Sequence, residues 1–409
     1  MLALLIFLLV VNRGLLANDT FPRLMGMNIG KKHYQNPTYQ QELAKLDIVI
    51  LGFYRSWGDH KKSKQGVLNR LKALNPKILV GQYVVLNELR DESNDKAKED
   101  MRLKVTNANW WLKNHAGERV QWTSRYNAWE VNFTEMATSD AENKHYPQWL
   151  AERYYLVYRH VVPDLDFWYT DNVLHRPPVK ADWDTNGVDD DPDSPVILKA
   201  WREGYVALWN RMRDLTPDMM IMGNTNGDLS QYEFKGRLNA AFLEALMGKK
   251  WSIETRSGWK AMMERYRSVK ANLTDPRIIG FNVSGNPKDY RFFRYAFTSC
   301  LLDDGYFSFT DEKRGYSSVP WFDEYDIELG RAISLPPVKP WKNGVWRRDF
   351  ENGVVLINPN TVESEVVLDQ DLWRFTGKQA PNWNNGVQVK SIVLPAKDGI
   401  VLLRRKASN

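Results

Sequence analysis

The sequence has a single cysteine, Cys300, so no disulfide can form within its 409 residues. Its six histidines include no His-x-x-x-His pair and no spacing typical of zinc ligands. No Gly-x-Ser-x-Gly motif is present, and Cys300 lies in an apolar stretch typical of a buried structural thiol. These absences argue against zinc, serine and thiol chemistry.

Basic residues are not gathered into an arm or stripe, although the net charge is +6 and the pI is about 9.0. Nucleic-acid-binding proteins more often show a concentrated basic patch, so we expect no nucleic-acid partner. The apolar run at residues 1–11 is too short to span a bilayer, so no stable membrane span is expected in the mature chain.

The same run resembles the core of a secretory signal, with cleavage expected after Ala17. We therefore expect a secreted or periplasmic protein, and the lack of disulfides favours a bacterial host. A membrane-tethered form is the alternative.

Aromatic residues are abundant, with 17 Trp, 18 Tyr and 16 Phe. Sugar rings pack well on aromatic side chains, but most such rings in a globular protein belong to the core. The length exceeds that of one ordinary core and predicts two domains.

Short apolar runs alternate with amphipathic stretches over the first 310 residues or so. Eight runs predict buried strands at residues 23–30, 47–54, 77–86, 166–173, 219–223, 239–247, 277–284 and 306–309. Helical patterns lie between them at 38–46, 65–74, 148–160, 196–215, 258–271 and 287–302. The fold class is therefore α/β, and eight units favour a closed (β/α)8 TIM barrel.

A Pro-rich stretch at residues 334–340 reads as a linker. Beyond it, strand-like runs at 345–350, 354–358, 364–368 and 399–403 predict a small antiparallel β-sandwich. The expected organisation is a signal peptide at 1–17, a catalytic barrel at 18–333 and the C-terminal β-sandwich domain at 341–409.

Two carboxylates at predicted strand ends are the candidate catalytic residues. Asp171 ends the fourth run, and Glu244 lies toward the end of the sixth. Barrel enzymes build their sites at these ends, and glycoside hydrolysis needs one carboxyl group as acid and another as nucleophile or base. A turn or N-cap Asp and a salt-bridged Glu are the alternative interpretations.

Other polar and aromatic side chains follow predicted strands or lie in the long connection after the third one. For each of them, a role as a turn or rim residue is as good an interpretation as a contact with a ligand. The candidate substrate-binding residues are Tyr54, Arg55, Trp57, Glu88, Trp122, Trp129, Glu130, Asn172, Asn224, Asn226 and Asn282. Of these, Trp57, Trp122 and Trp129 are the expected sugar-stacking residues, and Glu130 is a weaker acid candidate.

The acidic loop at residues 182–193 has the spacing of a Ca2+-binding loop. Its oxygen-bearing residues Asp182, Asp184, Asn186 and Asp193 occupy positions 1, 3, 5 and 12, with Gly187 at position 6. We expect no required cofactor and a structural Ca2+ ion at these four residues; a solvated acidic loop is the alternative.

Several motifs resemble the hypothetical glycoside-hydrolase-like family fifteen. They are the segments at residues 23–27 (RLMGM), 168–172 (WYTDN), the 182–193 loop and 348–359 (RDFENGVVLINP). The resemblance covers most of the mature chain and implies a glycosidase barrel with an amylase-like terminal β-domain. Barrels of the alpha-galactosidase type place a nucleophile on the fourth strand and an acid/base on the sixth. Asp171 and Glu244 match these positions, although that group has Asp at the second.

These observations favour a glycoside hydrolase that cleaves O-glycosidic bonds of a polysaccharide or oligosaccharide. Asp171 would be the nucleophile or charge stabiliser, and Glu244 the general acid/base. A non-catalytic carbohydrate-binding barrel and a polysaccharide lyase are the alternatives.

Overall fold

The computed structural model describes residues 19–30, 33–52, 64–93 and 96–406. Eight parallel strands form one sheet in the order of the chain. They are β2 (Met25–Asn28), β3 (Ile48–Leu51), β4 (Leu79–Val84), β8 (Phe167–Thr170), β9 (Met220–Asn224), β10 (Ala240–Met247), β11 (Ile278–Gly285) and β12 (Tyr306–Asp311). A parallel bridge between Leu24 and Phe307 closes the sheet into a barrel. The (β/α)8 barrel is confirmed, and each predicted run overlaps one strand.

Side chains of alternate residues fill the barrel interior. Met25 and Met27 of β2, and Phe167 and Tyr169 of β8, point into this inner core. The residues between them face the surrounding helices, so the strands are buried on both faces and read as continuous apolar runs. A Cβ atom on Gly81 would lie 2.0 Å from the Phe167 ring, so only glycine leaves room for that ring.

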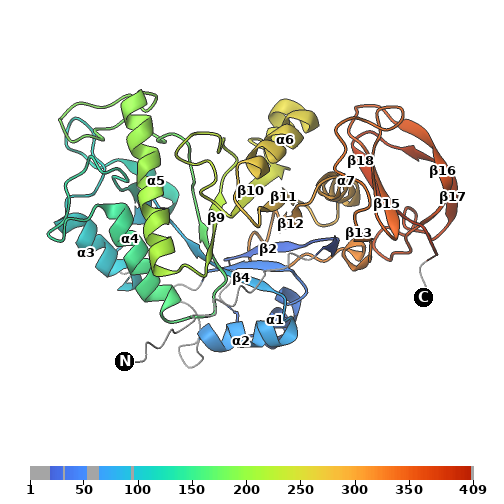
Figure 1. Ribbon diagram of the computed structural model, residues 1–409, viewed down its shortest axis with the longest axis horizontal. Helices are drawn as coiled ribbons and strands as arrows, with labels where there is room; N and C mark the ends of the chain where they lie inside the picture. The colour runs from blue at the N-terminus through green and yellow to red at the C-terminus, as the bar shows by residue number, and fades with distance from the viewer. Residues whose placement is uncertain (1–18, 31–32, 53–63, 94–95, 407–409) are drawn as a thin grey trace, which may run out of the picture.

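Helices surround the barrel (Figure 1). They are α1 (Pro37–Leu43), α2 (Lys64–Leu74), α4 (Tyr146–Tyr154), α5 (Pro195–Leu215), α6 (Ile253–Ala271) and α7 (Tyr290–Leu301), each overlapping a predicted helix. A π-helical turn, Tyr155–Arg159, continues α4. None of the described helices is both long and apolar enough to cross a membrane. The signal peptide predicted at 1–17 lies outside the described residues.

The long connection after β4 holds structure that the sequence pattern did not predict. Helix α3 (Glu99–Asn107) buries only Met101 and Val105, so its periodicity is weak. A small antiparallel sheet joins β5 (Glu88–Arg90), β7 (Ala128–Glu130) and β6 (Gln121–Thr123). Strands this short are below the length at which alternation is recognisable.

The C-terminal strands form a separate antiparallel sheet beside α7 (Figure 1). Its order is β14 (Trp346–Asp349), β15 (Gly353–Asn358), β18 (Asp398–Leu403), β16 (Ser364–Arg374) and β17 (Gln388–Leu394). The predicted antiparallel β-domain is confirmed, but the sequence pattern does not predict β17, a mostly exposed strand with two buried residues.

Strand β15 is buried on both faces and joins two cores. Val355 and Ile357 pack in the core shared with the barrel, whereas Val354 and Leu356 pack in a second core with residues of β16 and β17. A sandwich would have two separate sheets as its layers. The described C-terminal strands belong instead to one hydrogen-bonded sheet with a core on each face. The domain boundaries at 333 and 341 stay a prediction.

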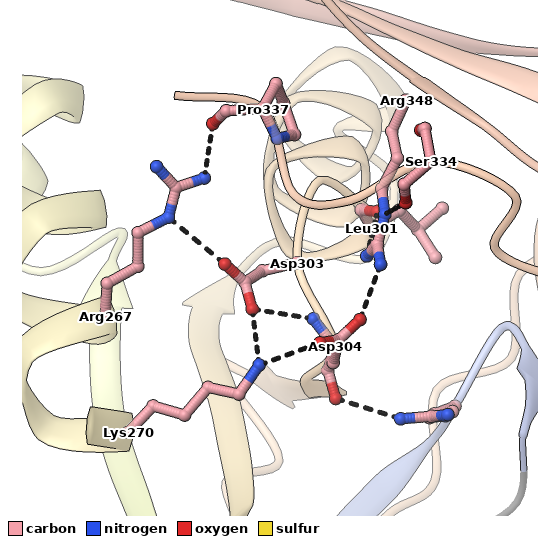
Figure 2. A network of polar contacts seen from close by, with 9 residues as sticks. Arg267, Lys270, Leu301, Asp303, Asp304, Ser334, Pro337 and Arg348 are labelled. Atoms are coloured by element: carbon pink, nitrogen blue, oxygen red, sulfur yellow. Dashed lines mark hydrogen bonds and ion pairs between the residues drawn. The ribbon is translucent and has the colours of Figure 1, made fainter. Parts of the chain in front are cut away.

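A polar network fastens the linker and the C-terminal sheet to the barrel (Figure 2). Asp303 accepts hydrogen bonds from Arg267 and Lys270 of α6, at 3.1 and 2.7 Å. The adjacent Asp304 accepts one from Arg348 of β14 at 2.5 Å, and Arg267 also donates to a carbonyl oxygen of the linker. Because Arg348 is only 2% exposed, the network forms part of the packed interface.

Candidate active site

Three side chains from neighbouring strands meet at the carboxyl end of the barrel. Asp171 follows β8, Asn224 ends β9, and Glu244 lies in the last half of β10. The Asn224 Nδ2 atom donates to Asp171 Oδ1 at 2.7 Å and to Glu244 Oε2 at 2.8 Å. The two carboxylate oxygens can therefore be no farther apart than these two lengths together. The structure brings together the two carboxylates that the sequence selected.

A break in strand geometry presents Glu244 at the barrel mouth. Ala245 has a left-handed φ of 48°, and the pairing of β10 with β11 shifts register between Leu243 and Met247. The Asn282 side chain accepts from Ala245 N at 2.9 Å, and Ser252 donates to the Ala245 carbonyl at 2.6 Å. Bulges of this kind redirect side chains near active sites. Glu244 is consequently half-buried between fully buried neighbours.

Two tyrosines complete the hydrogen bonding of the carboxylates. The Tyr83 hydroxyl donates to Asp171 Oδ2, and the Tyr316 hydroxyl donates to Glu244 Oε1. Tyr83 lies on β4 and stacks on Tyr169 with ring centroids 5.6 Å apart. Sequence reasoning missed both tyrosines. The one available signal was that Tyr83 stands next to the last residue of its strand.

The surroundings of Asp171 set its acidity. Burial raises the pKa of Asp171 above its usual value, and the charge of Glu244 raises it further. Hydrogen bonds from Tyr83 and Asn224 act in the opposite direction because they stabilise the carboxylate. The tyrosine and the asparagine therefore help to keep the group charged in a buried position.

Replacing Tyr83 by Phe should move the acid limb of the kcat/KM profile to higher pH by about one unit. The variant loses a hydrogen bond to the Asp171 carboxylate, so that group takes up a proton at a higher pH than in the wild type. If activity requires the Asp171 carboxylate, the variant loses activity at a higher pH than the wild type as the solution is acidified. Tyr232→Phe, in a side chain that is 91% exposed, serves as the control. An unmoved acid limb in Tyr83→Phe would contradict the prediction.

Glu88 and Glu130 are buried opposite each other on β5 and β7, with Glu88 close enough to Asp171 to feel its charge. The sequence analysis chose both as candidate substrate-binding residues. However, Glu130 is fully buried and Glu88 is 9% exposed, so neither carboxyl group is open to a large ligand. Burial and the nearby Asp171 charge raise the pKa of Glu88 to about 8. Burial and the nearby Glu88 raise the pKa of Glu130 to about 9. Both carboxyl groups therefore favour the uncharged form at neutral pH.

The other predicted binding residues have different surroundings. Asn172 donates to Glu88 at 3.0 Å, and Asn226 donates to the Glu244 carbonyl at 2.6 Å. Asn282 is 1% exposed with its amide fully engaged, so it supports the bulge beside Glu244 instead of facing a ligand. Trp122 is 38% exposed, whereas Trp129 is half-buried. Tyr54, Arg55 and Trp57 lie outside the described residues.

The acidic loop gathers three carboxylates. Ligand oxygens of Asp182, Asp184 and Asp190 lie within 4.8 Å of one another, and oxygen donors are those that Ca2+ prefers. The predicted Asn186 donates from its side chain to Asp184 at 2.9 Å. The predicted fourth ligand, Asp193, is not in this group; its carboxylate accepts two bonds from Arg176, at 2.8 and 3.1 Å. The third carboxylate of the group belongs to Asp190, which the sequence analysis did not choose.

A parallel (β/α)8 barrel with two carboxylates at the carboxyl ends of its fourth and sixth strands has the architecture of the TIM-barrel glycoside hydrolases. The sequence agrees with this class. Residues 72–354 match the family model described as hypothetical glycosyl hydrolase family 15, and the chain belongs to that family. A search of curated proteins found no relative of similar sequence.

Solved structures of similar fold include several carbohydrate-active proteins. Amy13B of Eubacterium rectale has a TM-score of 0.53 at 10% identity, covering 94% of this chain and 95% of its own. An alpha-amylase of Anoxybacillus has a TM-score of 0.47 at 12% identity, with coverages of 94% and 98%. The glycoside hydrolase domain of PelA from Pseudomonas aeruginosa has a TM-score of 0.45 at 12% identity, with coverages of 74% and 98%. At such identities the likeness concerns the fold alone.

Proposed function

We propose that the protein hydrolyses O-glycosidic bonds of a polysaccharide or oligosaccharide, with Asp171 as nucleophile and Glu244 as general acid/base. The observation that carries this proposal is the Asn224 amide, which binds one oxygen of each carboxylate at the barrel mouth. Such a pair supplies both functions that glycoside hydrolysis needs.

The closeness of the two carboxylates favours a retaining mechanism. Retaining enzymes have carboxyl groups about 5–5.5 Å apart, whereas inverting enzymes leave about 6.5–9.5 Å for a water molecule. One oxygen of Asp171 and one of Glu244 accept hydrogen bonds of 2.7 and 2.8 Å from the same nitrogen. The distance between these two oxygens cannot exceed the sum of the two lengths, which fits the shorter separation of retaining enzymes.

The reaction then has two steps. A carboxylate oxygen of Asp171 bonds to the anomeric carbon while the glycosidic C–O bond breaks, and Glu244 gives its proton to the leaving oxygen. In the second step Glu244 takes a proton from water, the resulting oxygen bonds to the anomeric carbon, and the ester to Asp171 breaks. Tyr83 and Asn224 hold Asp171 in place through both of its oxygens. Trp122 offers an exposed ring for sugar stacking.

A product screen tests the proposal against its two alternatives. The purified protein is incubated with a broad panel of polysaccharides, and new reducing ends and ultraviolet absorbance are measured. Reducing ends without absorbance support hydrolysis, whereas an absorbing unsaturated product identifies a lyase. Binding of one glycan with no cleavage indicates a carbohydrate-binding barrel.

We also propose that Asp182, Asp184 and Asp190 hold a structural Ca2+ ion, since they offer three carboxylates within 4.8 Å.

Calcium at a hundredfold excess over its Kd should raise the free energy of unfolding by about 2.7 kcal/mol. Asp184→Asn should lose most of this gain. Asp193→Asn should keep it, because Asp193 pairs with Arg176. Thermal unfolding in CaCl2 and in NaCl of equal ionic strength measures the effect, and equal stability in both salts would refute the site.

A further inference from the structure

Glu88 and Glu130 form a buried pair beside the candidate nucleophile. They stand directly opposite each other in the antiparallel pairing of β5 with β7. Side chains at such positions are near neighbours. Glu88 accepts one bond from Asn172 at 3.0 Å, and Glu130 accepts one from Asn87 at 3.4 Å. The other oxygen of each group is buried with no hydrogen-bond partner among the described residues.

The surroundings of the pair contain little positive charge. The charged groups that act on Glu88 are Asp171 after β8 and Lys98 just before α3. The other titratable groups close enough to interact with it are the uncharged tyrosines Tyr146 and Tyr154 on α4 and Tyr205 on α5. Lys98 is the cation among these groups, and its attraction for Glu88 is smaller than the effects of burial and of Asp171. Two buried carboxylates in such surroundings are strongly disfavoured as anions.

Asn172 connects the pair to Asp171. Its backbone is in the left-handed region with φ of 56°. Its side-chain amide donates to Glu88, and its carbonyl oxygen accepts from the Tyr205 hydroxyl at 2.6 Å. Its backbone N–H donates to Asp171 Oδ1 at 3.0 Å. Asn172 therefore contacts Glu88 through its side chain and the candidate nucleophile through its backbone.

We propose that Glu88 is a positioning residue that acts in its uncharged form beside an uncharged Glu130, holding Asn172 against Asp171 without placing a second negative charge beside it. The inference rests on the proposed function of Asp171. Two neighbouring carboxylates cannot both ionise easily, so a proton kept on Glu88 leaves the charge on Asp171. The raised pKa values of the pair, about 8 and 9, agree with this arrangement.

Variants of Glu88 test both parts of the proposal. Glu88→Gln keeps an uncharged acceptor for Asn172, so it should retain at least about a third of wild-type kcat. Glu88→Leu removes the acceptor and should lower kcat by about tenfold to a hundredfold with little change in KM. Glu118→Gln, a change at an exposed residue of the same connection, should behave as wild type.

The acid limb of the kcat/KM profile shows whether Glu88 is charged in the wild-type protein. If Glu88 is already uncharged, Glu88→Gln leaves the acid limb where it is. If Glu88 is charged, removing that charge makes Asp171 easier to ionise and moves the limb to lower pH, which overturns the proposal. A loss of kcat in Glu88→Gln equal to that in Glu88→Leu also overturns it.

Stability against pH gives a readout that does not depend on activity. Carboxyl groups with raised pKa values bind protons in the folded state that the unfolded state has released. Stability therefore falls as the pH rises from the unfolded value near 4.5 toward 8 to 9. The Glu88→Gln/Glu130→Gln variant should show a smaller fall, because it lacks the contribution of the pair, while Asp171 keeps its own. If the double variant and the wild type have the same profile of stability against pH, the pair is not uncharged. This conclusion holds whether or not Asp171→Asn supports the proposed function.

Discussion

Asp171→Asn should lower kcat on every cleaved substrate by about a thousandfold or more, while KM changes little. The substitution keeps the shape of the side chain and removes the charge that attacks the anomeric carbon in the proposed mechanism. Loss of a group that acts only in the transition state lowers kcat and kcat/KM together. Positioned acid–base groups alone contribute about 10²–10⁴-fold, and a missing nucleophile costs at least as much. Release of reducing ends from the substrate found in the product screen measures the loss.

Asp218→Asn is the matched control for this experiment. Its exposed carboxylate pairs with Arg159 at 2.5 Å just before β9, at the end of the barrel opposite to Asp171. It should keep wild-type kcat. Glu244→Gln should resemble Asp171→Asn, with a loss of about 10²–10⁴-fold. Less than a tenfold loss in both Asp171→Asn and Glu244→Gln would show that these carboxylates do not carry the reaction.

Asp398→Asn should lower the free energy of unfolding by about 3–5 kcal/mol. Asp398 of β18 is 1% exposed and accepts two hydrogen bonds from Arg294 of α7, at 2.9 and 2.7 Å. Its replacement leaves a buried guanidinium without its counter-charge, and that loss costs more than a surface pair contributes. Denaturant unfolding measures the change.

Asp369→Asn is the control on the same sheet, because Asp369 pairs with Lys342 and Arg347 at the surface. It should change stability by less than about 1 kcal/mol. A similarly small loss in Asp398→Asn would show that α7 and the C-terminal sheet do not depend on the buried pair. The expected large loss supports a C-terminal domain that braces the barrel, since α7 connects β11 with β12.

The buried pair of glutamates illustrates where local sequence patterns stop being informative. The sequence makes Glu130, flanked by Trp129 and Val131, a weaker acid candidate. The structure buries it opposite Glu88, whose sequence position is 42 residues earlier. Whether a carboxyl group is charged depends on its solvent and its neighbours in space. No local pattern contains that information.

The sequence by itself determined the barrel, the C-terminal antiparallel sheet, and the strand ends that carry Asp171 and Glu244. It could do so because strands buried on both faces must be apolar, which makes an acid at their ends conspicuous. Only the tertiary structure decided that Tyr83 and Tyr316 bind these carboxylates, that Asn224 bridges them and that Asp190 joins the acidic loop. Hydrogen bonds and protonation states depend on distances between strands and loops far apart in the chain, and these distances are fixed only when the barrel closes.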